Sequence, residues 1–183
     1  MIQDRVQRGL RNLAKRIAKR VGSNNLFEQP GERPSQEPIF EEASDSMIQL
    51  MTSEQIEECL LEARVVNHWA TWCEPCVDEL DILFSIQSHI GPDKMLGINW
   101  DLFQGGTFDE ARLEITEQTE KIGLTYRHCV VSDSPDDFFA HFGLEEQIVP
   151  QTIVYSPAFE VLFHRVGVLT EEDIVKVVQL VKQ

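Results

Sequence analysis

The sequence has only four cysteines among its 183 residues, too few for a disulfide-rich secreted scaffold. It also has no apolar run near the roughly 20 residues that a membrane span requires. The first twenty residues lack the continuous apolar core of a signal peptide, so we expect none. These absences predict a cytoplasmic protein, with peripheral contact to a membrane as an option and an exported or organellar location as the alternative.

Basic residues are scarce outside the start of the chain. The sequence has 16 Lys and Arg against 31 Asp and Glu, a formal net charge of −15. Residues 1–22 hold seven basic residues and one acidic residue, so they carry +6 and the rest carries −21. An acidic body of this kind argues against nucleic acid as a partner.

Residues 1–22 have the pattern of a basic amphipathic helix, since apolar residues recur at steps of three or four. Three interpretations stay open: weak binding to an anionic membrane surface, docking on a partner protein or the acidic body, and a targeting peptide. Residues 23–44 contain Pro30, Pro34 and Pro38 without apolar periodicity, which indicates a flexible linker.

Residues 45–183 alternate between strand and helix patterns and end with two strands and a helix. Strands are expected at 47–51, from 65, at 94–100, 126–131, 152–155 and 161–166. Helices are expected from 53 to about 63, from 73 or 74 to about 90, at 109–122 and 135–142, and from 170. This alternation predicts an α/β fold, a mixed central sheet with helices on both faces.

Two cysteines three residues apart, Cys73 and Cys76, follow a strand pattern and open a helix pattern. Pro75 suits the first turn of that helix. Unpaired amide groups and the helix dipole stabilise a thiolate there, so the pKa of Cys73 should lie below that of a free cysteine. Cys73 can then attack a partner disulfide, and Cys76 can resolve the mixed disulfide.

Two other interpretations of the Cys73–Cys76 pair remain open. One is half of a zinc site, but zinc normally needs four ligands, and Cys59 and Cys129 look isolated in the sequence. The other is a pair of inert core cysteines. We therefore expect no metal, and no cofactor beyond the dithiol itself. Cys59 and Cys129 are expected to be packing residues, with a regulatory thiol as the alternative for Cys59.

The stretch from Val65 to Leu80, with its Trp72-to-Cys76 run, resembles the active-site stretch of TlpA/ResA-like thiol-disulfide oxidoreductases of the thioredoxin superfamily. The resemblance spans about residues 47–183. It implies a thioredoxin fold with an extra strand–helix insertion, and exchange with protein thiols and disulfides. It also matches Pro150 to the cis proline that lies against the cysteines in that family, and gives Val149 a backbone role in substrate binding. A trans proline opening a strand is the alternative.

Several residues around the motif carry further expectations. Asn67 stands where thioredoxins have a buried aspartate, so Glu79 is a candidate proton acceptor for Cys76, although a solvated helix glutamate is the alternative. Glu74 adds negative charge beside Cys73, which favours a reducing protein. Trp72 is expected to wall the site.

Two residues depart from the family pattern. His68 replaces an apolar aromatic, and strand alternation directs it to the face opposite Asn67. Asp81 replaces a proline, which predicts a straighter helix after the cysteines. The leading hypothesis is a protein-disulfide reductase. The rival is a thioredoxin-fold adaptor, delivered by residues 1–22, in which redox chemistry is incidental.

Overall fold

The fold is built on one six-stranded mixed sheet, in a computed structural model that describes residues 47–144 and 147–183. The strands are β1 (Ile48–Met51), β2 (Val65–Trp69), β3 (Met95–Asn99), β4 (Arg127–Val131), β5 (Gln151–Tyr155) and β6 (Val161–Val166). They lie in the order β1-β4-β3-β2-β5-β6. The pairs β1–β4, β4–β3 and β3–β2 are parallel, whereas β5 runs antiparallel to both β2 and β6.

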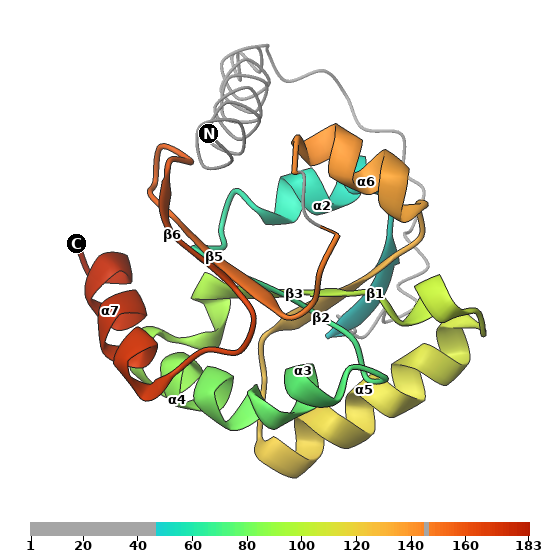
Figure 1. Cartoon of the computed structure of the whole chain (residues 1–183), viewed down its shortest axis with the longest axis horizontal. Helices are drawn as coiled ribbons and strands as arrows, with labels where there is room; N and C mark the ends of the chain where they lie inside the picture. Colours follow the sequence, from blue (N-terminus) through green and yellow to red (C-terminus); the bar gives the residue numbers. More distant parts are fainter. Residues whose placement is uncertain (1–46, 145–146) are drawn as a thin grey trace, which may run out of the picture.

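Helices cover both faces of the sheet. They are α2 (Ser53–Cys59), α3 (Glu74–Asp78), α4 (Leu80–Ile90), α5 (Phe108–Ile122), α6 (Pro135–Phe142) and α7 (Glu171–Val181), with the 3-10 turns η1 (Pro92–Lys94) and η2 (Asp101–Gln104). Helices α2 and α6 lie on one face, and α3, α4, α5 and α7 lie on the other (Figure 1). The architecture is therefore the mixed α/β sheet that the sequence predicts.

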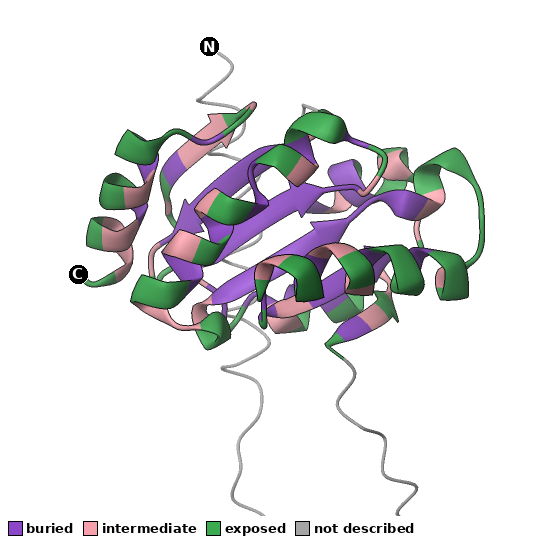
Figure 2. Ribbon diagram, turned by 90° about the horizontal axis from the view of Figure 1, so that it is seen from below, coloured by how far each residue is buried: buried purple, intermediate pink, exposed green. Residues whose placement is uncertain are grey.

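The hydrophobic core lies on both sides of the sheet. Figure 2 shows the sheet as a layer of buried residues, in purple. Every residue of β2, β3 and β5 is buried. Strands covered on both faces need apolar residues at most positions rather than at alternate ones. Asn67 and His68 are polar residues buried in β2. The Asn67 side-chain nitrogen donates hydrogen bonds to Glu79 and Thr152, whereas Asn67 Oδ1 and His68 Nδ1 have no hydrogen-bond partner among the described residues.

Helix boundaries follow from local capping chemistry. Thr107 and Glu110 form a capping box at the start of α5, and Gly123 ends that helix in the left-handed conformation. Ser134 accepts a hydrogen bond from the amide of Asp137 at the start of α6. These ends agree with the predicted ones to within a residue.

Two predicted helices differ from the structure. Helix α2 ends at Cys59 rather than near Ala63. The segment after the cysteines is not one straight helix, because it is interrupted at Glu79 between α3 and α4. The carboxylate of Glu79 is anchored beneath the helix by two hydrogen bonds, and we attribute the interruption to that anchor. The absence of a proline at position 81 therefore does not straighten this segment.

The predicted helix over 1–22 and linker over 23–44 lie outside the described residues. In the part of the chain that the structure covers, no helix combines the length and apolar character needed to cross a membrane.

Candidate active site

Cys73 and Cys76 form a disulfide at the end of the sheet where β2 stops. Cys73 is the N-cap of α3, and its carbonyl oxygen accepts hydrogen bonds from the amides of Cys76 (2.9 Å) and Val77 (3.1 Å). Cys73 has a residue exposure of 7%, whereas Cys76 is fully buried. Cys73 is therefore the more accessible cysteine of the pair.

A short turn between β2 and α3 holds Cys73 in place. The amide of Thr71 donates a 2.7 Å hydrogen bond to the carboxylate of Asp101, and the amide of Asp101 donates to Asn99. Burial raises the pKa of the Asp101 carboxyl, against the lowering effect of the Thr71 bonds. Sequence reasoning missed Asp101, because 30 residues separate it from Thr71 and only the topology brings them together.

Glu79 is fully buried at the junction of α3 and α4. It accepts hydrogen bonds of 2.9 Å from the Asn67 side chain and from the Leu169 amide. Burial raises the pKa of Glu79 to about 7, although both hydrogen bonds lower it. The solvated alternative for Glu79 is thus wrong, and its carboxyl has the pKa that suits proton transfer near neutrality. Its role as proton acceptor stays a prediction.

Asn67 connects the two halves of the site. Besides Glu79, its side-chain nitrogen donates a 3.1 Å hydrogen bond to the hydroxyl of Thr152 on β5. Thr152 is the register partner of Asn67 across the β2–β5 pair. The asparagine therefore positions the buried carboxylate from the sheet side, as a neutral residue that adds no second charge.

The peptide bond between Val149 and Pro150 is cis, as the resemblance implies. Pro150 is buried and immediately precedes β5, whose first residue Gln151 is in register with His68 of β2. Since β2 leads into the Cys73 turn, Pro150 and the disulfide lie at the same end of the β2–β5 strand pair. The carbonyl of Pro150 accepts a 2.9 Å hydrogen bond from the amide of Gly167.

An apolar cavity lies at this end of the sheet. It has a volume of about 60 Å³ and is lined by Trp72, Trp100, Phe103, Pro135, Phe139, Gln147 and Val149. Trp72 is 39% exposed, and Phe103 is more exposed still. The structure thus brings Trp72 and Val149 together at one surface that could receive a substrate side chain.

Helix α3, which follows Cys73, carries acidic charge. Helix α3 contains exposed Glu74 and Asp78 and no basic residue. It has only five residues, so its dipole offers less support to a thiolate than a long helix would. His68 lies on the opposite face of the sheet, as predicted, where it stacks on Trp100 and burial lowers its pKa to about 3.

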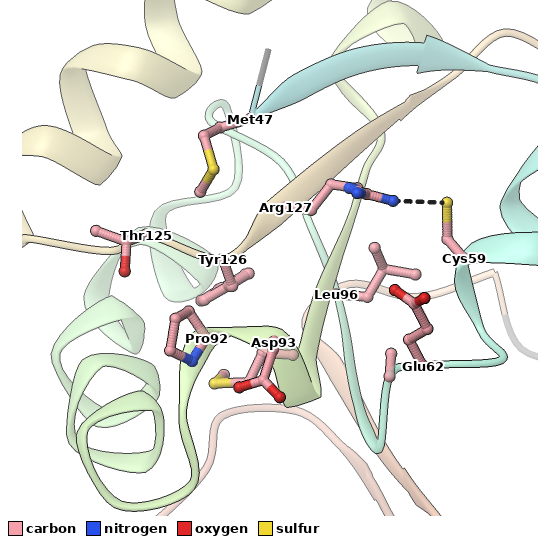
Figure 3. Close-up of a pocket in the computed structure, with 11 residues that line it drawn as sticks. Met47, Cys59, Glu62, Pro92, Asp93, Leu96, Thr125, Tyr126 and Arg127 are labelled. Carbon is pink, nitrogen blue, oxygen red and sulfur yellow. Dashed lines mark hydrogen bonds between the residues drawn. The ribbon is translucent and has the colours of Figure 1, made fainter. Parts of the chain in front are cut away.

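Cys59 and Cys129 are free thiols, on α2 and β4. The Cys59 sulfur lies 3.8 Å from the Met51 sulfur and accepts a hydrogen bond from the Arg127 guanidinium over 3.5 Å (Figure 3), and Cys129 is buried. The described residues contain no cluster of three or more His, Cys, Asp and Glu that could hold a metal ion.

Comparison with solved structures gives matches to thiol-disulfide oxidoreductases. A DsbF homologue from Corynebacterium diphtheriae is 26% identical with a TM-score of 0.51, covering 63% of this chain and 69% of its own. A secreted thiol-disulfide isomerase from Corynebacterium glutamicum has the same identity and TM-score, covering 65% and 70%. A thioredoxin-family thiol:disulfide interchange protein from Chlorobium tepidum is 18% identical with a TM-score of 0.52, covering 69% and 85%.

No family model matches the chain, and no curated protein does. The fold and the Cys73–Cys76 disulfide agree with the structural matches and support the TlpA/ResA-like resemblance. The chain is a thioredoxin-fold protein of the thioredoxin superfamily, similar to thiol-disulfide oxidoreductases.

Proposed function

We propose that the chain is a protein-disulfide reductase that works through Cys73 and Cys76. The observation that carries the proposal is the asymmetry of the pair, because Cys73 lies at the N-cap of α3 and is the more accessible cysteine, while Cys76 is fully buried. This arrangement suits one attacking and one resolving sulfur. The dithiol is itself the redox group, so the proposal needs no further cofactor.

The reaction proceeds in two exchanges. The Cys73 thiolate attacks a substrate disulfide, forms a mixed disulfide and releases one substrate thiolate. Cys76 then loses its proton, for which the buried carboxylate of Glu79 is the candidate acceptor, and attacks the Cys73 sulfur. The second substrate thiol leaves, and the protein ends as the Cys73–Cys76 disulfide. A dithiol donor must return the two electrons.

The reducing direction rests on charge. A dithiol protein becomes a strong oxidant when its reduced, thiolate form is stabilised. Helix α3 offers little such stabilisation, since it is short and carries Glu74 and Asp78 without a basic residue. We therefore expect a reduction potential closer to the thioredoxin value of about −270 mV than to the DsbA value of about −120 mV.

The proposed substrates are protein disulfides, because the similar structures are thiol-disulfide oxidoreductases. We propose the exported alternative over the cytoplasmic one, on the ground that the similar Corynebacterium glutamicum protein is secreted. The adaptor alternative, and contact with a membrane or partner protein, depend on residues 1–22, which lie outside the described residues.

Reduction of insulin with a dithiol donor tests the proposal. Wild-type protein should accelerate it, Cys73→Ser should not, and Cys76→Ser should trap a mixed disulfide on Cys73. Cys59→Ser serves as the matched control that removes a different thiol. Insulin reduction that survives Cys73→Ser would show that the assignment is wrong.

A further inference from the structure

The side chain of Gln151 anchors the segment that precedes β5. Gln151 is buried, is the first residue of β5 and follows Pro150 directly. Its amide nitrogen donates a 3.1 Å hydrogen bond back to the carbonyl of Ile148. This contact closes a short loop, from Ile148 to Gln151, that contains Val149 and Pro150. A side chain therefore holds the segment that lies at the same end of the β2–β5 pair as the disulfide.

His164 of β6 fixes the orientation of that amide. Gln151 is in register with Val166 of β6, so His164, two residues before Val166, lies on the same face of the sheet and diagonal to Gln151. The His164 Nε2 atom is 3.0 Å from the Gln151 oxygen. A carbonyl only accepts hydrogen bonds, so the Gln151 nitrogen points at Ile148 and its oxygen at His164, whose Nε2 carries the hydrogen. The reversed amide would place two oxygens against each other at Ile148.

The backbone of Val149 lies unpaired between two anchored carbonyls. The carbonyl of Ile148 accepts from Gln151, and that of Pro150 accepts from the Gly167 amide. Among the described residues, neither the amide nor the carbonyl of Val149 makes a hydrogen bond. Val149 also lines the apolar cavity at this end of the sheet. A backbone that is fixed but unpaired can bind an extended chain with little further loss of conformational freedom.

We propose that Gln151 is a positioning residue for substrate binding, and that His164 sets its orientation. By holding the Ile148 carbonyl, Gln151 fixes the direction in which Val149 presents its amide and carbonyl to an extended segment of the substrate protein. The proposal deepens the function proposed for Cys73 and rests on it. Gln151 acts through Val149 and not on the reacting sulfur atoms, so its removal should weaken substrate binding rather than slow the exchange itself.

Gln151→Met tests the proposal, because methionine has a similar length and volume but loses both hydrogen bonds. With insulin as the substrate and a dithiol donor, the variant should raise KM roughly threefold to tenfold and leave kcat within about twofold. Alkylation of reduced Cys73 by iodoacetamide should keep its rate, since this small reagent makes no use of the Val149 backbone. A lower kcat with KM unchanged would overturn the positioning role.

Gln87 provides the matched control. It is a buried glutamine on α4, whose nitrogen donates to the Gly123 carbonyl over 3.3 Å and whose oxygen accepts from the Thr125 amide over 2.7 Å. These partners precede β4, whereas Cys73 follows β2, which runs in the same direction, so Gln87 lies towards the opposite end of the parallel strands. Gln87→Met should destabilise the fold and leave KM unchanged. An equal rise in KM in both variants would show that Gln151 acts through stability alone.

His164→Phe tests the second part of the proposal. Phenylalanine keeps an aromatic ring but cannot donate to the Gln151 oxygen. The variant should raise KM by less than Gln151→Met does, and the double variant should match Gln151→Met alone, because the histidine acts through the glutamine. Additive effects on KM would overturn the role of His164.

NMR relaxation separates this proposal from the function on which it rests. In Gln151→Met, but not in Gln87→Met, the ¹⁵N order parameters of the Ile148 and Val149 amides should fall below the rigid-backbone value of about 0.85. If wild-type protein fails to reduce insulin while this fall is seen, the reductase function is overturned and the anchoring of Val149 is supported. Unchanged order parameters, or insulin reduction with the same KM in wild type and Gln151→Met, would overturn the positioning role alone.

Discussion

The Cys73–Cys76 pair and the two free cysteines, Cys59 and Cys129, lie in different surroundings. Cys73 and Cys76 lie within a single helical turn, beside acidic Glu74 and Asp78. Cys59 ends α2, where the Arg127 guanidinium donates a hydrogen bond to its sulfur, and Cys129 is buried within β4. The pair is defined by local geometry, whereas the surroundings of Cys59 depend on tertiary packing.

The comparison separates two ways of controlling a thiol. Near Cys73, the buried polar group is a carboxyl, Glu79, whose raised pKa allows it to take up and release a proton. Near Cys59, the neighbouring group is a permanent cation, which can stabilise a thiolate but cannot accept its proton. The first arrangement provides a group that can exchange a proton, whereas the second does not.

The sharpest way to break the comparison is to remove one sulfur at a time. Cys73→Ser should reduce insulin reduction to the uncatalysed rate, since the attacking sulfur is gone. Cys59→Ser should leave the wild-type rate within about twofold, because Cys59 ends α2, which lies on the opposite face of the sheet from α3 (Figure 1). The measurement is insulin turbidity with a dithiol donor. A comparable loss in both variants would mean that Cys59 also contributes to the reaction.

The sequence was sufficient for the strand and helix order and for the Cys73–Cys76 motif, because both depend on local patterns. The Trp-Cys-Glu-Pro-Cys run and the Pro150 segment are each contiguous, and their family resemblance supplies the link between them. The motif can therefore be identified from the sequence alone.

The sequence alone could not predict contacts between residues that are far apart in the chain and that the fold brings together. Asp101 reaches Thr71 because β2 and β3 are adjacent, and the Arg127 guanidinium reaches the Cys59 sulfur from 68 residues away in the chain. Nor could spacing decide whether Glu79 was solvated or buried. That outcome depends on Asn67 and on the distant Leu169 amide, which together hold its carboxylate within the core.

The buried carboxyl of Glu79 should make stability fall as pH rises. Below the unfolded pKa of about 4.5, Glu79 is protonated in both the folded and the unfolded state, so its ionisation does not change the free energy of unfolding. Between there and its folded pKa of about 7, the unfolded chain ionises first, so the penalty grows to about 3 kcal/mol above pH 7. Relative to Glu79→Gln, wild-type protein should therefore lose about that much free energy of unfolding between pH 4 and pH 8.

Denaturant unfolding at a series of pH values checks this difference. Glutamine cannot accept from the Leu169 amide with its nitrogen, but that cost does not change with pH and cancels in the comparison. The matched control is Asp81→Asn, which removes an exposed carboxylate two residues away. A wild-type-to-Gln difference that stays flat with pH would place the pKa of Glu79 near its ordinary value.

The smallest expected effect concerns the turn that presents Cys73. Asp101→Ala removes the acceptor for the Thr71 amide and should cost about 1–3 kcal/mol, whereas Asp101→Asn keeps a carbonyl oxygen there and should cost less. Because the anchor acts at one end of the sheet, the alanine variant should slow insulin reduction severalfold and leave alkylation of Cys59 unchanged. Stopped-flow alkylation of both thiols in each variant measures this. If Cys59 slowed in step with Cys73, Asp101 would be acting on the whole sheet rather than on one turn.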